Sequence, residues 1–165
     1  MVLVRPIEKN DEPVVAEIIR TVLEESHLDV PGTAYFDPQL DYMYDHYQSQ
    51  VDSEYWVIEE EGNIVGGVGI GLLASSILGL GKVGEIQKLY LLPETRGKGY
   101  SRRLMETLMA FSLSQGYDYL YLETIHTLKA AIRLYEKLDF ERLDAPIDAK
   151  SHHPLMDVFM GKRLN

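Results

Sequence analysis

A glycine-rich turn with several basic side chains lies in the sequence LLPETRGKGYSRRLMETL, residues 91–108. Gly97 and Gly99 let the backbone approach a ligand closely, because neither carries a Cβ. The turn follows an apolar, strand-like segment and opens an amphipathic helix, so unpaired N–H groups and the positive end of the helix dipole meet there. The same stretch contributes four basic side chains: Arg96, Lys98, Arg102 and Arg103. Together these features predict a binding site for phosphate groups.

Two other glycine patterns resemble a dinucleotide fingerprint, which works only where a strand ends and a helix begins. GLGKVG at 79–84 matches G-x-G-x-x-G but is followed by the strand-like EIQKLYLL. GIGLLA at 69–74 matches the looser form but lies within a strand. We interpret both as turn and close-packing glycines. A Walker motif is also disfavoured, since Lys98 is followed by Gly99 and not by Ser or Thr.

The composition restricts the class of protein. The chain has 165 residues, a net charge of −10 and no cysteine. The acidic balance argues against nucleic-acid binding, and no apolar run approaches the ~18 residues of a membrane span. The N-terminal segment lacks the pattern of a signal peptide. The absence of cysteine excludes disulfides and thiolate chemistry, and we expect a cytoplasmic location.

Hydrophobic periodicity predicts a single α+β domain over residues 1–165. We expect a mixed, mostly antiparallel central sheet flanked by about four helices, with a parallel pairing around the basic turn. The predicted strands lie at 2–7, in a hairpin over 54–73, and at 85–92, 117–125, 140–143 and 156–160. The predicted helices run from Asn10 or Asp11 to about Glu25, over 38–50, after the basic turn, and over 126–140. Residues 27–38 are predicted to form a loop.

Two motifs on these elements resemble the GNAT superfamily, the Gcn5-related N-acetyltransferases. The family signature is Arg/Gln-x-x-Gly-x-Gly/Ala between the fourth strand and the next helix. Arg96, Gly99 and Ser101 stand at its positions, with a small serine in the last place. LYEKLDF at 134–140 is similar to the family's Leu-Tyr-Glu-Lys-x-Gly-Phe, with Asp139 in place of the glycine. The order of the predicted elements also resembles the family over almost the whole chain.

The resemblance implies an N-acetyltransferase that moves an acetyl group from acetyl-CoA, as co-substrate, to an amine by direct transfer in a ternary complex. An acyl-cysteine intermediate is excluded, because the chain has no cysteine. Two alternatives stay open. One is a non-catalytic acyl-CoA sensor or interaction module on the same fold. The other is a nucleotide-phosphate binder that uses the glycine turn.

The resemblance also implies where the co-substrate binds. Backbone groups around Leu89, Tyr90 and Leu91 would pair with the pantetheine amides, and the RGKGYS amides would hold the pyrophosphate. The residues expected at this phosphate end are Arg96, Gly97, Lys98, Gly99, Tyr100, Ser101 and Arg102.

Three side chains are candidates for proton transfer. Tyr135 matches the family tyrosine of LYEKLDF, and its phenol would donate a proton to the departing sulfur. The alternative is a core tyrosine at helical spacing. Glu85 begins the strand that leads to the co-substrate, where its carboxylate could accept the amine proton. Glu123, at the end of the neighbouring strand, is a rival, and an isolated strand-end Glu is more commonly structural.

The acceptor is predicted to be a small cationic amine, such as a polyamine, an amino sugar or a lysine-like group. The chain holds 26 acidic against 16 basic residues, and carboxylates along DPQLDYMYD at 37–45 and EEEGN at 59–63 could attract a cation. His152 and His153 suggest a metal site, but adjacent residues of an extended chain point to opposite sides. We therefore expect no metal and a loop role near the acceptor pocket. A homodimer is left open.

Overall fold

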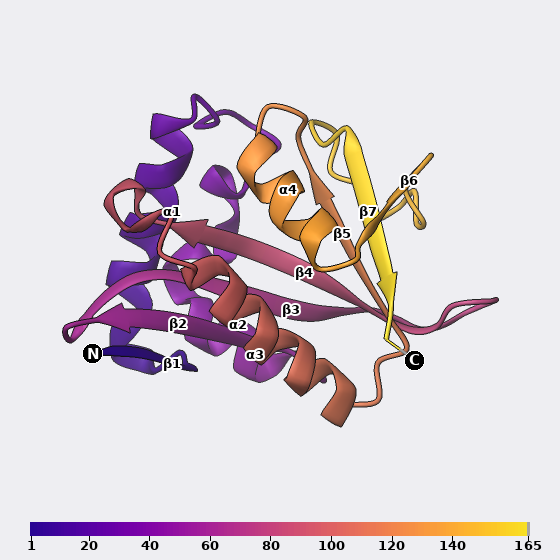
Figure 1. The fold of residues 1–165 in the computed structure, drawn as a ribbon, viewed down its shortest axis with the longest axis horizontal. Helices are drawn as coiled ribbons and strands as arrows, with labels where there is room; N and C mark the ends of the chain where they lie inside the picture. The colour runs from indigo at the N-terminus through magenta and orange to yellow at the C-terminus, as the bar shows by residue number, and fades with distance from the viewer. Residues whose placement is uncertain (165) are drawn as a thin grey trace.

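The computed structural model describes residues 1–164 and shows one sheet with the strand order β1-β2-β3-β4-β5-β7-β6 (Figure 1). The strands are β1 (Val2–Pro6), β2 (Glu54–Glu60), β3 (Asn63–Ile77), β4 (Gly81–Leu91), β5 (Tyr119–Thr124), β6 (Glu141–Leu143) and β7 (Val158–Arg163). The helices are α1 (Glu12–Glu25), α2 (Met43–Ser49), α3 (Tyr100–Ser114) and α4 (Lys129–Lys137). Neighbouring strands are antiparallel except β4 and β5, which are parallel. The predicted α+β class is therefore confirmed.

The helices cover both faces of the sheet (Figure 1). On one face α3 and α4 bury side chains such as Leu104 and Ile132 against the sheet, and on the other α1 and α2 bury Ile19 and Met43. β5 serves both faces, because side chains alternate along a strand. Its leucines join the α3 and α4 side, and its tyrosines pack on the opposite side with Val83. None of the helices within residues 1–164 combines the length and apolarity needed to cross a membrane.

β4 and β5 diverge towards their C-terminal ends. They pair only from Val83 with Tyr119 to Glu85 with Tyr121. Beyond Glu85, the side of β4 that faces β5 has no strand partner, while β5 continues its pairing with β7. Figure 1 shows the two arrows spreading apart. Backbone groups of the last part of β4 are therefore left for another partner.

Two predicted helices are shorter than expected. The 38–50 segment begins as a 3₁₀ helix, Pro38–Tyr42, and α2 follows because the backbone of Tyr42 leaves the helical region at φ −137°. The predicted 126–140 helix starts only at Lys129, since the backbone N–H and ring of His126 bind the Asp157 carboxylate at 2.9 and 2.6 Å. It ends before Asp139, whose φ of 69° is the left-handed geometry that a glycine usually supplies.

The two dinucleotide-like glycine patterns have the packing and turn roles predicted for them. GLGKVG spans the β3–β4 turn and the start of β4, and GIGLLA lies inside β3. At Gly69 a Cβ would stand 2.6 Å from the Tyr47 hydroxyl and 2.7 Å from the Tyr55 ring. Gly69 is thus required so that two tyrosines can pack on the sheet.

Candidate active site

The basic turn presents open backbone at the start of α3. Gly97 and Gly99 have φ values of 79° and 80°, in the left-handed region that side chains disfavour. A Cβ at either position would have no atom within 4 Å. Gly99 is the N-cap, and no side chain caps the helix. The first N–H groups of this fifteen-residue helix are therefore free to bind an anion.

Two of the four cations of the turn pair with carboxylates of the protein. Arg96 Nη1 lies 2.8 Å from Glu25 Oε1, and Lys98 Nζ lies 2.9 Å from Glu60 Oε2. The Tyr100 hydroxyl also donates to Glu60. Both ion pairs are exposed, and such pairs stabilise a protein by only about 0–1 kcal/mol. An arriving phosphate can therefore displace them at small cost.

Arg103 and Arg102, the other two cations of the turn, differ in whether the protein binds their guanidinium groups. Arg103 Nη2 donates to the Val2 carbonyl at 3.5 Å. Arg102 is exposed, and no side chain or carbonyl in residues 1–164 binds its guanidinium. Arg102 is thus the cation of the turn that is available to a ligand without breaking a contact.

A β-bulge shapes the part of β4 that borders the gap. Lys88 and Leu89 together oppose one residue of β3, and Lys88 has a φ of 52°. The Tyr55 hydroxyl donates to the Lys88 carbonyl at 3.0 Å, and Lys88 Nζ pairs with Asp37 at 2.9 Å. These contacts hold the bulge, and with it the following residues that were predicted to bind pantetheine. A lysine in the left-handed region leaves no signal in the sequence, so this bulge was not predicted.

Tyr135 projects from α4 with an exposed fraction of 6%, and its ring packs 5.9 Å from that of Phe140. Within residues 1–164 no group hydrogen-bonds to its hydroxyl, while every fully buried side-chain polar atom there has a partner. The hydroxyl therefore keeps contact with solvent. Burial raises the pKa of Tyr135, so the phenol stays protonated at neutral pH. Burial and then Tyr135 also raise the pKa of Tyr90.

Glu85 is held on the face of the sheet covered by α1 and α2. Gln87 Nε2 donates to Glu85 Oε1 at 2.9 Å, and the Tyr47 hydroxyl donates to Gln87 Oε1 at 2.7 Å. His153 Nε2 lies 3.8 Å from Glu85 Oε2, and the Glu85 carboxylate raises the pKa of His153. Gln87 was missed in the sequence, although its position two residues after Glu85 places both on one face of the strand.

Glu123 is bound by three donors, and its side chain is 2% exposed. Oε2 accepts from the Tyr121 hydroxyl at 2.7 Å. Oε1 accepts from the His153 N–H at 2.9 Å and lies 3.1 Å from His152 Nδ1. These contacts anchor the segment that carries both histidines, so the Glu123 carboxylate has a structural role.

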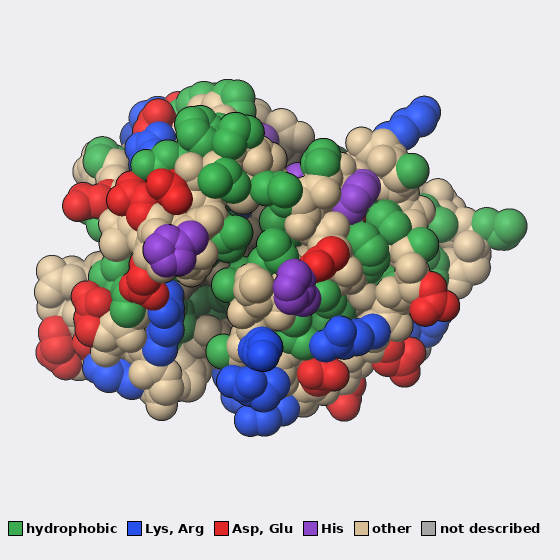
Figure 2. All heavy atoms as spheres, turned by 90° about the horizontal axis from the view of Figure 1, so that it is seen from above, with side chains coloured by type: hydrophobic (Ala, Val, Ile, Leu, Met, Phe, Trp, Pro, Cys, Tyr) green, Lys and Arg blue, Asp and Glu red, His purple; other side chains and the backbone are tan. Residues whose placement is uncertain are grey.

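A cavity of about 210 Å³ has both candidate carboxylates, Glu85 and Glu123, in its lining. It is lined by the loop from Gly32 to Gln39, by β4 from Glu85 to Tyr90, and by Glu123, His153 and Met156. Figure 2, which views this end of the molecule, shows a hollow with histidine side chains around it. The lining of this cavity contains three carboxylates and two basic side chains, which are Asp37, Glu85, Glu123, Lys88 and His153. In the described residues 1–164, no cluster of three or more His, Asp or Glu side chains could hold a metal ion.

The acidic segments expected to attract the acceptor are already neutralised. Each of their carboxylates pairs with a cation of the chain: Asp37 with Lys88, Asp41 with Arg20, Asp45 with Lys9, Glu59 with Arg5, Glu60 with Lys98, and Glu61 with the N-terminus. The 59–61 segment also lies beside the basic turn and outside the lining of the cavity. The expectation of a cationic acceptor therefore loses this support and rests on Glu85, because Asp37 is paired with Lys88 and Glu123 is bound by three donors.

The His153–Glu85 contact predicts a pH-dependent stability. The pKa of His153 is raised above its ordinary value of 6.5. Its stabilising effect is thus fully present below about pH 6.5 and is lost as pH rises through the raised pKa. His153→Gln should lower the thermal midpoint more at about pH 5.5 than at about pH 8.5. His27→Asn, which removes an exposed histidine that has no ion pair in residues 1–164, is the control. An equal loss from His153→Gln at both pH values would contradict the pairing.

The family model described as "Acetyltransferase (GNAT) family" matches residues 19–140, and the chain belongs to this family. A curated relative, the "Uncharacterized N-acetyltransferase YjgM" of Escherichia coli (strain K12), is 40% identical over 151 residues. This match covers 91% of the chain and 88% of the relative.

Solved structures agree in fold. A GNAT-family acetyltransferase from Staphylococcus aureus Mu50 has a TM-score of 0.84 at 17% identity, with all of both chains covered. The putative acetyltransferase yncA from Salmonella typhimurium, solved with acetyl-CoA, has a TM-score of 0.76 at 22% identity. That match covers 99% of this chain and 94% of the Salmonella chain. The predicted family resemblance is confirmed.

Proposed function

We propose that this protein transfers an acetyl group from acetyl-CoA to a primary amine by direct attack in a ternary complex. The observation that carries the proposal is the divergence of β4 and β5 beyond Glu85, which leaves one side of β4 without a strand partner. Glu85 lies at the base of this opening on the α1 and α2 face, and Tyr135 on α4 packs on the α3 and α4 face, with no protein group of residues 1–164 bound to its hydroxyl. A thioester in the opening would have a donor on one side and an acceptor of protons on the other.

The residues present fit acetyl-CoA. The bare glycine turn and the uncapped start of α3 suit the pyrophosphate, with Arg102 as an adjacent charge. The unpaired side of β4 after Glu85 suits the pantetheine amides. The support from relatives is that the Salmonella protein was solved with acetyl-CoA.

The chain's own groups account for each proton. The amine must lose a proton to attack the thioester carbonyl, and Glu85 accepts it, directly or through water. The carbonyl oxygen carries negative charge until the carbon–sulfur bond breaks. Tyr135 donates its phenolic proton to the leaving sulfur, and the second proton, which the nitrogen loses as the tetrahedral intermediate collapses, restores the phenol. The products are an acetamide and free CoA, with the first proton on Glu85. We assign Glu85 and not Glu123 as the base, because the latter is already bound by three donors.

The test is the release of free thiol from acetyl-CoA with a panel of primary amines, together with mass spectrometry of the acetylated product. Thiol release that depends on an amine and matches the product supports the proposal. Tight CoA binding without transfer to any amine would contradict it and favour a non-catalytic acyl-CoA sensor.

The phosphate end of the site gives a separate prediction. Arg102→Glu should weaken CoA binding about tenfold, because it replaces an available cation with a repelling anion. The effect should shrink as salt increases, since exposed charges are screened. Calorimetry measures both, and Arg142→Glu, on the exposed strand β6, is the matched control. Equal CoA affinity in the two variants would remove this turn from the site.

A further inference from the structure

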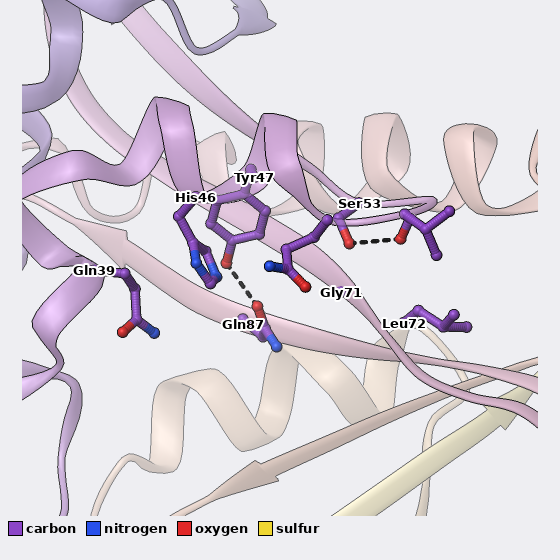
Figure 3. A pocket seen from close by; sticks show the side chains of 9 residues that line it. Gln39, His46, Tyr47, Ser53, Gly71, Leu72 and Gln87 are labelled. Carbon is purple, nitrogen blue, oxygen red and sulfur yellow. Dashed lines mark hydrogen bonds between the residues drawn. The ribbon is translucent and has the colours of Figure 1, made fainter.

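A second cavity, of about 330 Å³, lies beside the candidate active site. It lies between α2 and the strands β3 and β4, and its walls include His46 and Gln50 (Figure 3). Gln39 and Gln87 line this cavity and the catalytic one alike. The two cavities are therefore neighbours that share walls.

The lining of this second cavity is polar but carries no fixed charge. Neither Asp, Glu, Lys nor Arg is among the residues that line it. His46 is its one titratable side chain besides tyrosine. Burial, and then the charge of Lys88, lower the pKa of His46, so its imidazole is neutral at pH 7. The cavity therefore offers hydrogen bonds without an ionic partner.

Two side chains on its wall have unused hydrogen-bonding capacity. The Gln39 amide and the His46 ring are half-buried, and neither has a hydrogen-bond partner in residues 1–164. The His46 ring is held edge-on against the Tyr47 ring, with centroids 5.1 Å apart. Polar groups in such positions gain from a partner that satisfies them. A ligand with donors and acceptors would do so.

The shared wall links this cavity to the base. The Tyr47 hydroxyl donates to Gln87 Oε1 (Figure 3). The amide nitrogen of Gln87 donates to Glu85 Oε1 at 2.9 Å. A single side chain thus separates the neutral cavity from the carboxylate that would deprotonate the amine. An acceptor whose amine reaches Glu85 would extend past Gln87 to place its distal part beside His46 and Gln39.

We propose that this cavity is the acceptor-recognition subsite, and that it takes an uncharged hydrogen-bonding group such as a carboxamide or a hydroxylated carbon. The inference rests on the proposed acetyl transfer and specifies its substrate class. A distal ammonium or carboxylate would lose water there without gaining an opposite charge. The acceptor thus carries its charge on the reacting amine and is neutral at its other end. Among the predicted acceptors, this favours amino sugars over polyamines.

The test compares acceptors of matched chain length that differ only at the distal end: ω-amino carboxamides, ω-amino carboxylates, α,ω-diamines and n-alkylamines. At the best length, kcat/KM for the carboxamide should exceed that for the alkylamine by about tenfold or more. A preference for the diamine or the carboxylate, or no preference at any length, overturns the subsite.

Two variants connect the preference to the cavity. Gln39→Leu and His46→Phe each remove polar atoms with little change in volume. Each should reduce the carboxamide preference about tenfold, and His46→Phe, whose residue does not line the catalytic cavity, should change kcat/KM for the alkylamine little. Gln48→Leu removes an exposed amide on α2 that lies outside the cavity lining, and should leave the preference intact.

The outcomes separate the two proposals. Acetylation with an unchanged preference in both cavity variants overturns the subsite alone. Failure of every amine to be acetylated overturns the proposed function and the subsite with it. The use of two substitutions keeps the test decisive if one of them impairs folding.

Discussion

Tyr135→Phe is expected to lower kcat by about two to three orders of magnitude while leaving the Kd for acetyl-CoA nearly unchanged. The reason is that a proton donor to the leaving sulfur acts in the transition state and adds little to ground-state binding. The phenol is suited to this role, because burial raises the pKa of Tyr135 and no protein group in residues 1–164 occupies its hydroxyl. The measurements are steady-state kinetics with a saturating amine and calorimetry with acetyl-CoA.

The fold should tolerate this substitution, because the phenylalanine ring can keep the contact with Phe140. Tyr119→Phe is the matched control. Tyr119 is also a buried tyrosine without a hydrogen bond to its hydroxyl in the described residues, but it lies where β5 still pairs with β4. Full turnover in both variants would make Tyr135 a packing residue, as its helical spacing alone suggests.

Much of the fold was predictable because its signals are local. The glycine turn that opens α3 and the alternation of leucine and tyrosine in β5 each depend on neighbouring residues. The parallel pairing of β4 and β5 followed from the helix between them. Boundaries were less accurate where a distant side chain intervenes, as when Asp157 binds His126 and shortens α4.

The site was only partly predictable because its electrostatics are non-local. Glu25 and Glu60 neutralise Arg96 and Lys98 from 71 and 38 residues away. A short stretch of sequence around the turn contains neither glutamate, so these ion pairs could not be predicted from it. Gln87 could have been predicted from the sequence, because it shares a strand face with Glu85. The left-handed bulge at Lys88 could not be predicted, because a tertiary hydrogen bond from Tyr55 and an ion pair hold it.

Glu85→Gln is expected to reduce kcat/KM about a hundredfold near pH 7, because the variant cannot accept the proton that the amine must lose. The deficit should shrink as pH approaches the pKa of the free amine, where the acceptor arrives already neutral. The measurement is a pH profile of kcat/KM for wild type and variant with the same amine. A deficit that is constant with pH would indicate lost binding instead of lost base catalysis.

The same substitution has a spectroscopic readout that turnover does not provide. The Glu85 carboxylate is the main cause of the raised pKa of His153, so in Glu85→Gln this pKa should fall towards its ordinary value of 6.5. NMR titration of the histidines measures the shift, and His126, which pairs with Asp157, is an internal control. An unchanged His153 titration would show that the carboxylate does not face the imidazole in solution.

Glu123→Gln distinguishes the two carboxylates. Glu123 anchors the segment from Ser151 to Pro154 through His152 and the His153 backbone, so its loss should loosen that segment and raise the acceptor KM. The pH dependence should remain that of the wild type, since Glu85 is still present. If Glu123→Gln instead abolishes the pH dependence and Glu85→Gln retains it, the base is Glu123. The Gln87–Glu85 hydrogen bond would then serve only to order β4.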